Sequence, residues 1–137
     1  MLEYDNLSQK QKDFFDKSIW NGVGSRDFFI NPHDLIFKEA SKYHDFAYWR
    51  GGPEELRIKA DKDFFHRAHS AVRKQSLLKR PFYYATSYVY FYFLKIGGKR
   101  AFEYYERPAD TWEELLARVN FYFDENPKKE GRPPKYK

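Results

Sequence analysis

The sequence predicts a mostly α-helical protein, and two kinds of observation support that fold class. Capping-box patterns, in which Ser or Thr is followed three residues later by Gln or Glu, occur at Ser8 with Gln11 and at Thr111 with Glu114. Glycines and prolines divide the chain between them into segments of helical length. With 137 residues, the chain fits one domain of ordinary size. We therefore expect a single all-α domain.

The first two predicted helices are separated by a glycine-containing loop. The first helix opens at Ser8 and stops before residues 21–25, which read Asn-Gly-Val-Gly-Ser. An Asn-Pro pair at 31–32 restarts the chain into a second helix near Asp34, and this helix should end at the glycine pair 51–52.

The third predicted helix follows directly after that glycine pair. Pro53 with two glutamates after it marks a helix start, because acidic side chains suit the positive end of the helix dipole. The helical pattern continues to about Leu78, before Pro81 breaks it. The second and third helices then form a long antiparallel hairpin.

Two further helices are expected near the C-terminus. Residues 82–96 are nearly all apolar, so neither a helical nor a strand period can be read from them; we favour a helix that ends at the glycine pair 97–98. The last helix begins after Thr111 and ends at Pro127. Its apolar residues have helical spacing: Leu115, Leu116, Val119 and Phe123.

The composition excludes several classes of protein and separates a tail from the body. There are 14 Phe, 12 Tyr and 3 Trp but no Cys, which rules out a disulfide-stapled secreted mini-protein, a thiolate metal site and a cysteine nucleophile. Residues 128–137 carry four of the five net positive charges. We therefore predict a domain over 1–126 and a basic tail over 127–137, for which a solvated, disordered terminus is the simplest interpretation.

The glycine pair 51–52, taken as the bend of the hairpin, sets which residues of its two arms face each other. Residues whose numbers sum to about 105 should lie opposite, and each arm carries a stripe at i, i+3, i+7 and i+10 that is apolar except for one residue. The four predicted pairs are Phe37 with Ala68, Ala40 with Phe65, His44 with Asp61, and Ala47 with Ile58. Burying the one polar pair becomes tolerable when the carboxylate accepts a ring N–H of the imidazole.

This predicted pair has a structural and a functional interpretation. It could be a buried His–Asp pair that serves only the fold. Alternatively, Asp61 fixes the tautomer of His44 and leaves the other ring nitrogen available as a base. Tyr48 lies one turn beyond His44 on the same face, so its hydroxyl could also reach Asp61.

Asp45 follows His44 but is rotated by about 100° around the helix, so it needs a partner of its own. The alternating residues Trp20, Gly22 and Gly24 can turn successive backbone carbonyls toward one point, because glycine accepts otherwise strained dihedrals. Three carbonyls and the Asp45 carboxylate would make most of a Ca²⁺ site, since Ca²⁺ prefers hard oxygen ligands. A plain loop between helices is the alternative.

Three segments, in this order, resemble the calcium-dependent secreted-type phospholipase A₂ superfamily. They are the aromatic-x-G-x-G loop at 20–24, the H-D-x-x-Y segment at 44–48 and the D-x-x-F segment at 61–64. The Cys-free H-D-F-A-Y version looks most like the parvovirus-capsid and the microbial or phage branches. The resemblance implies a phospholipase A₂-like fold, in which two long antiparallel helices carry the site beside a calcium loop and flanking helices.

The resemblance also implies an activity, the calcium-dependent hydrolysis of the sn-2 ester of glycerophospholipids to a fatty acid and a lysophospholipid. His44 would activate a water molecule, and Asp61 would stabilise the imidazolium that forms. Tyr48 would support Asp61, and the Gly22 N–H would help to stabilise the oxyanion.

In the same resemblance, Ca²⁺ would be held by Asp45 and by the carbonyls of Trp20, Gly22 and Gly24. The implied partner is a phospholipid membrane surface, bound peripherally. No nucleic acid partner is expected, and the sequence indicates no oligomeric state.

The two ends of the sequence and its apolar runs bear on location. The acidic, polar start does not resemble a secretory signal, and the longest apolar run, residues 82–94, is shorter than a membrane-spanning helix requires. We expect an intracellular, virion-associated or phage-associated protein, or one delivered by a non-classical route.

Two other functions stay open at this stage. An HD-type metal-dependent phosphohydrolase would gather a transition metal with imidazole and carboxylate ligands. Its candidate ligands are His33, His44, Asp45 and either His66 or His69. A catalytically inert membrane-binding or RNA-binding module would instead use the basic tail and exposed tyrosines.

Overall fold

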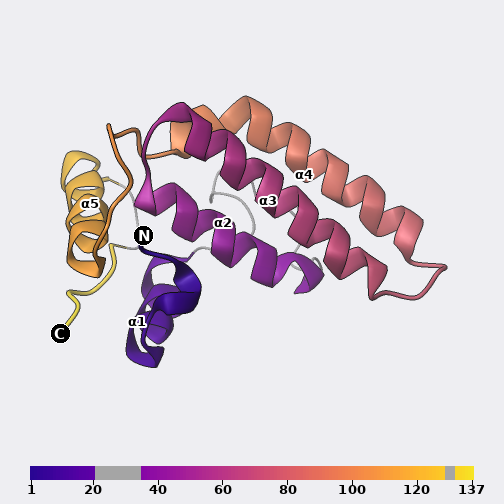
Figure 1. Cartoon of the computed structure of the whole chain (residues 1–137), viewed down its shortest axis with the longest axis horizontal. Helices are drawn as coiled ribbons and strands as arrows, with labels where there is room; N and C mark the ends of the chain where they lie inside the picture. The colour runs from indigo at the N-terminus through magenta and orange to yellow at the C-terminus, as the bar shows by residue number, and fades with distance from the viewer. Residues whose placement is uncertain (21–34, 129–131) are drawn as a thin grey trace.

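The computed structural model describes residues 1–20, 35–128 and 132–137, and within these ranges the chain is helical and holds no β-strand. The all-α class is therefore confirmed. The elements in chain order are η1 (Tyr4–Asn6), α1 (Gln9–Phe14), η2 (Phe15–Ile19), η3 (Leu35–Phe37), α2 (Lys38–Arg50), α3 (Glu54–Arg73), α4 (Arg80–Ala101) and α5 (Trp112–Glu125). Helices α2, α3 and α4 lie side by side with α3 in the middle, while α1 and α5 lie outside this layer near the N-terminus (Figure 1).

The start of α1 has the capping box that the sequence predicts. The Ser8 hydroxyl accepts the Gln11 N–H at 3.3 Å, and the Gln11 side chain accepts the Ser8 N–H at 2.8 Å. These two bonds satisfy amides that have no partner inside the helix. The chain then continues through the single π-helical turn η2, which buries Phe15 and Ile19.

The turn between α2 and α3 depends on its two glycines. Gly51 and Gly52 have φ angles of 68° and 129°, a region that other residues rarely adopt. A β-carbon on Gly51 would also lie 2.3 Å from the Glu103 carbonyl oxygen. The predicted end of the second helix at this glycine pair is thus confirmed. The segment that follows α4 contacts the same turn.

The boundary between α3 and α4 differs from the prediction. α3 ends at Arg73 instead of near Leu78, and Pro81 lies in the first turn of α4, where it does not break a helix. Proline is tolerated there because the amide it lacks would have no partner in the first turn. α4 also runs through the glycine pair 97–98 and ends at Ala101.

Gly98 has a packing role inside α4. It is buried, and a β-carbon at this position would lie 2.5 Å from the Tyr48 hydroxyl and 3.4 Å from the Arg57 guanidinium. The missing side chain therefore lets α4 approach the α2–α3 pair closely. Glycine has a low helix propensity, and this contact explains its presence in the interior of a helix.

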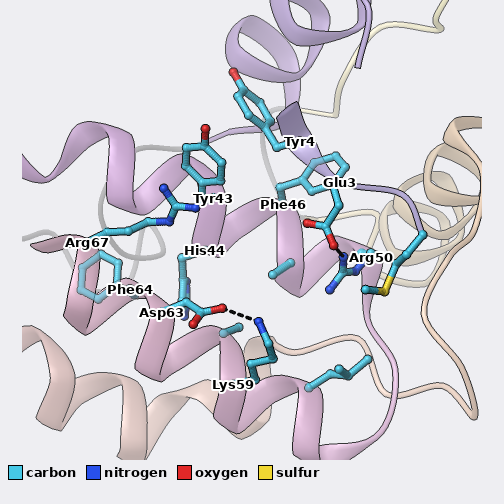
Figure 2. A pocket seen from close by; sticks show the side chains of 14 residues that line it. Glu3, Tyr4, Tyr43, His44, Phe46, Arg50, Lys59, Asp63, Phe64 and Arg67 are labelled. Atoms are coloured by element: carbon cyan, nitrogen blue, oxygen red, sulfur yellow. Dashed lines mark hydrogen bonds and ion pairs between the residues drawn. The ribbon is translucent and has the colours of Figure 1, made fainter. Parts of the chain in front are cut away.

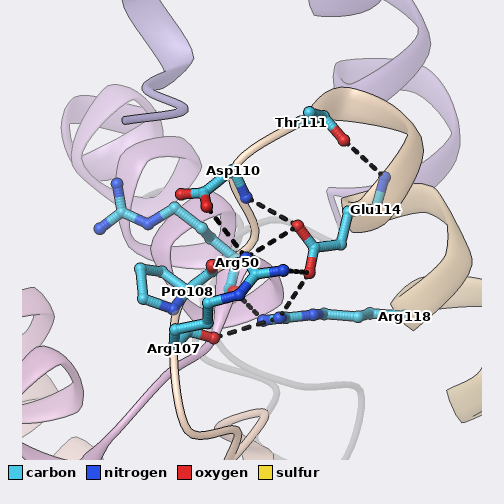
Figure 3. A network of polar contacts seen from close by, with 7 residues as sticks. All are labelled: Arg50, Arg107, Pro108, Asp110, Thr111, Glu114 and Arg118. Carbon is cyan, nitrogen blue, oxygen red and sulfur yellow. Dashed lines mark hydrogen bonds and ion pairs between the residues drawn. The ribbon is translucent and has the colours of Figure 1, made fainter.

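α5 is held against the end of α2 by an arginine network (Figure 3). Arg118 is buried, donates to the Arg50 carbonyl at the end of α2, and donates to the Arg107 carbonyl at 3.1 Å. Its guanidinium also bonds Glu114 at 3.2 Å. A cation at a helix C-terminus is favourable because it faces the negative end of the helix dipole. At the start of α5, Thr111 accepts the Glu114 N–H, as its capping-box pattern predicts.

The core divides into two main clusters of buried residues. The first joins the N-terminal segment, α2 and α5 through Leu7, Phe15, Ile19, Phe46, Ala109, Trp112, Leu115 and Val119. The second joins α2, α3 and α4 through Phe37, Ala40, Phe64, Ala68, Val72 and Tyr90. Tyr136, from the predicted basic tail, packs against Phe14 and Trp112 with ring centroids 5.2 and 5.4 Å apart. This part of the tail is therefore in contact with the first cluster.

Among the described residues, no helix combines the length and apolarity needed to cross a membrane.

Replacing Gly98 tests the close approach of α4. We expect Gly98→Ala to lower the free energy of unfolding by about 1–3 kcal/mol, because the added methyl group would overlap the Tyr48 hydroxyl. Gly97→Ala is the matched control in the same helix, and it should be neutral or stabilising by up to ~1 kcal/mol. Urea denaturation followed by circular dichroism measures both; equal stabilities would contradict the contact.

Candidate active site

The predicted polar pair lies where the hairpin register places it. His44 on α2 and Asp61 on α3 are both buried, with 7% and 4% of their surfaces exposed. The His44 Nε2 and the Asp61 Oδ1 atoms are 2.9 Å apart. Since Asp61 accepts from Nε2, the other imidazole nitrogen, Nδ1, is the one left for chemistry.

Asp61 accepts hydrogen bonds from two further side chains. The Tyr48 hydroxyl donates to Oδ1 at 2.6 Å, and the Arg57 guanidinium donates to Oδ2 at 3.0 Å. Burial and the adjacent Asp61 carboxylate raise the pKa of Tyr48, so its hydroxyl keeps the proton that it donates. The predicted support of Asp61 by Tyr48 agrees with this geometry, and the carboxylate is held on both of its oxygens.

Arg57 is the part of this site that the sequence interpretation missed. It is 6% exposed and forms an ion pair with Asp61 across one turn of α3. Its guanidinium also bonds Glu54 at 2.7 and 2.9 Å. The i, i+4 spacing of Arg57 and Asp61 is a signal present in the sequence, since residues so spaced on a helix can form an ion pair. A buried aspartate facing a histidine calls for such a compensating cation.

Two of the four predicted cross-hairpin pairs are wrong. Phe64 lies in the cluster with Ala40, whereas the predicted partner Phe65 packs toward α4, with its ring centroid 4.8 Å from that of Phe91. Ile58, predicted to face Ala47, is 41% exposed. The Phe65 error arises because α3 packs on α4 as well as on α2, which the two-helix prediction left out.

The charge state of His44 depends on two carboxylates. Burial by itself lowers the pKa of His44, but Asp45 and Asp61 together outweigh burial, so the pKa is raised above its ordinary value. The His44 Nδ1 and the Asp45 Oδ1 atoms are 3.9 Å apart, which is beyond hydrogen-bond distance. Asp45 thus lies on the Nδ1 side of the imidazole, as its rotation around α2 predicts.

Trp20 contacts the same side of α2 as Asp45. Its indole N–H donates to the Ser41 hydroxyl at 3.1 Å, and Asp45 follows Ser41 by one helical turn. The Asp45 carboxylate and the Trp20 carbonyl are hard oxygen donors, so they fit Ca²⁺ in kind. The other two predicted ligands, Gly22 and Gly24, lie outside the described residues.

Two histidines of the phosphohydrolase alternative, His66 and His69, lie in the described part of the chain and do not contact His44. His66 is exposed, and His69 packs against the rings of Phe65, Tyr84 and Tyr88 near α4. In the part of the chain that the structure describes, no three His, Asp or Glu side chains converge as metal ligands. His33, the remaining candidate, lies outside that part.

A hollow of about 160 Å³ lies next to His44 between α2, α3 and the N-terminal residues (Figure 2). Its lining from α2 includes Tyr43, Ala47 and Arg50, which lie on the flank of the helix away from Asp45. Two ion pairs form part of its lining, Arg50 with Glu3 at 3.1 Å and Lys59 with Asp63 at 2.7 Å. The hollow is therefore separate from the side of His44 where Asp45 lies.

Comparisons with protein-family models, with curated proteins and with solved structures found no match for this chain. The site geometry therefore carries the functional inference.

The burial of the Arg57–Asp61 pair predicts a large effect of removing its cation. We expect Arg57→Met to lower the free energy of unfolding by about 3–5 kcal/mol, because it leaves the buried Asp61 carboxylate uncompensated. Lys59→Met removes an ion pair of the same spacing in the same helix, but Lys59 and Asp63 are 67% and 53% exposed. That control should change stability by at most ~1 kcal/mol. Urea denaturation measures both variants, and equal effects would contradict the role of Arg57.

Glu54 extends this network to the surface and predicts a pH dependence. Hydrogen bonds from Arg57 and Tyr104 lower its pKa from 4.5 to about 2. A carboxylate with a lowered pKa stabilises the fold fully above its unfolded pKa, and that contribution is lost as pH falls toward the folded value. Stability should therefore fall between pH 5 and pH 2, and less steeply in Glu54→Gln. Glu55→Gln is the matched control, and denaturant midpoints across this range measure the slope; identical slopes for all three proteins would contradict the prediction.

Proposed function

We propose that this protein is a calcium-dependent phospholipase A₂, a carboxylic ester hydrolase that cleaves the sn-2 ester of glycerophospholipids. The observation that carries the proposal is the orientation of His44, whose Nε2 is bonded to a buried carboxylate while its Nδ1 lies on the side of Asp45. This is the arrangement of a general base with a fixed tautomer. The finer fold assignment, a phospholipase A₂-like hairpin with a calcium loop, belongs to the same proposal.

The roles of the residues follow from this geometry. His44 accepts a proton from water at Nδ1 as the water attacks the ester carbonyl, and returns it to the leaving alkoxide when the ester C–O bond breaks, so no covalent acyl-enzyme forms. Asp61 stabilises the positive charge that then develops on the imidazole. Tyr48 and Arg57 are positioning residues, because they contact Asp61 and fix the direction in which it holds His44.

Asp45 and the Trp20 carbonyl are the described residues that would hold Ca²⁺, with Gly22 and Gly24 as the further predicted ligands. Ca²⁺ would supply positive charge for the substrate phosphate and for the developing oxyanion. Asp45 supplies a carboxylate whose side chain is 25% exposed.

Fatty-acid release from phospholipid vesicles tests the proposal. The protein should release fatty acid only when Ca²⁺ is present, and His44→Gln should lower the rate by about 10²–10⁴-fold, because the general base is lost. Asp45→Asn should lower the rate at a given Ca²⁺ concentration and raise the Ca²⁺ concentration needed for activity, because it removes a charged ligand. His66→Gln and Asp63→Asn are matched controls on exposed positions of α3 and should retain the rate.

The outcomes of this assay separate the candidate functions. Activity that persists with a chelator would overturn the proposal. Turnover of nucleotides with Mn²⁺ and no release of fatty acid would favour a metal-dependent phosphohydrolase. The absence of both reactions in a folded protein would favour an inert binding module.

A further inference from the structure

The outer face of α4 carries an exposed apolar surface. Its members are Phe82, Tyr88, Val89, Tyr92, Phe93 and Ile96, each at least 39% exposed. Two leucines in the turn before the helix, Leu77 and Leu78, are 75% and 95% exposed. A group of large exposed apolar side chains on one helix is typical of an interaction site.

These residues form one face because of the helical period. At 100° per residue, the α4 members span an arc of about 140°, and the exposed Lys99 and Arg100 fall within the same arc. The opposite side of α4 holds the buried residues Ser87, Tyr90 and Gly98. α4 lies at the edge of the three-helix layer, with α3 on its inner side (Figure 1). We call the six exposed apolar residues the α4 outer face.

The charges on α4 have a single sign. The helix contains Arg80, Lys95, Lys99 and Arg100 and no acidic residue. The exposed Lys79 lies at one end of the apolar residues and the exposed Lys99 and Arg100 lie at the other, while the exposed Lys95 precedes Ile96. Lys95 lies 5.0 Å from the centre of the Phe91 ring. The surface is therefore apolar in the middle and positive at its ends.

We propose that the α4 outer face docks on the surface of a membrane that contains anionic phospholipids. Tyrosine and phenylalanine rings suit the boundary between head groups and acyl chains, and lysine and arginine are attracted to anionic head groups. A second copy of the chain fits this face less well, because two such faces would bring only positive charges together. An interfacial position also agrees with a helix that is too polar to span the bilayer.

This surface would bring the proposed lipase to its substrate, and in that respect the inference rests on the proposed function. Its structural basis is separate, because none of the proposed site residues His44, Asp61 and Asp45 belongs to the α4 outer face. The inner side of α4 contacts Tyr48 through Gly98, whereas the outer face points away from that contact. Binding and hydrolysis can therefore be measured independently.

Co-sedimentation with vesicles tests the proposal on the full chain. Vesicles of phosphatidylcholine with about one third phosphatidylglycerol should bind the protein, and pure phosphatidylcholine vesicles should bind it weakly. Lys99→Gln with Arg100→Gln should lower the partition coefficient about fivefold for each charge removed. Val89→Ser with Ile96→Ser should lower the partition coefficient more than the charge variant does, since both side chains would enter the interface.

Two controls keep the test specific. Phe121→Ser replaces an apolar residue on α5 that is 59% exposed, and Lys59→Gln removes a cation that is 67% exposed on α3. Both should retain vesicle binding. Circular dichroism and unfolding midpoints confirm that each variant is folded, which the exposed positions of the substitutions favour.

Three results would overturn the docking proposal. One is equal binding of the wild type and the α4 variants to anionic vesicles. Another is no vesicle binding by the wild type. The last is self-association in sedimentation velocity that is abolished by Val89→Ser with Ile96→Ser, which would assign the face to a second copy. His44→Gln should bind vesicles like the wild type, so a loss of hydrolysis without a loss of binding distinguishes the two proposals.

Discussion

The buried Asp61 carboxylate is the constraint on which much of this structure depends. A charge with 4% of its residue surface exposed is tolerated only when it is fully bonded, and Asp61 receives bonds from His44, Tyr48 and Arg57. Each of these partners places a demand on the fold. The glycine turn sets the register that brings His44 across from it, and Gly98 leaves room for the Tyr48 hydroxyl beneath α4.

The same constraint gives His44 two different sides. Asp61 bonds Nε2 in the buried seam between the helices, and Nδ1 lies toward Asp45, whose side chain is partly exposed. Trp20 joins that flank through Ser41, while the N-terminal residues and the hollow lie on the other flank of α2. The protein thus presents one nitrogen of a buried histidine toward the partly exposed Asp45 carboxylate.

Aromatic contacts take the place that disulfides hold in many small stable domains. The chain has no cysteine, and most ring pairs among the described residues meet edge to face, as do Phe15 with Phe46 at 5.4 Å and Tyr48 with Phe102 at 5.2 Å. Such pairs stabilise by about 0.5–1.5 kcal/mol beyond the area that they bury. On α4, the same residue types serve two purposes, since Tyr90 packs in the core while Tyr92 is exposed.

The sequence alone determined the all-α class, the helix starts after Ser8 and Thr111, and the helix end at Gly51. It also determined that His44 and Asp61 face each other. Capping, glycine turns and helical spacing are local signals, so they can be read without the fold. Tertiary structure decided the rest. Because α3 also packs on α4, Phe64 and not Phe65 lies in the seam with α2. The contact with Tyr48 explains Gly98, which lies within α4 although the sequence predicted a helix end there. Tertiary packing also decided which side of the almost uniformly apolar helix α4 is buried. The sequence of α4 carries no readable period, and burial depends on the neighbouring helix.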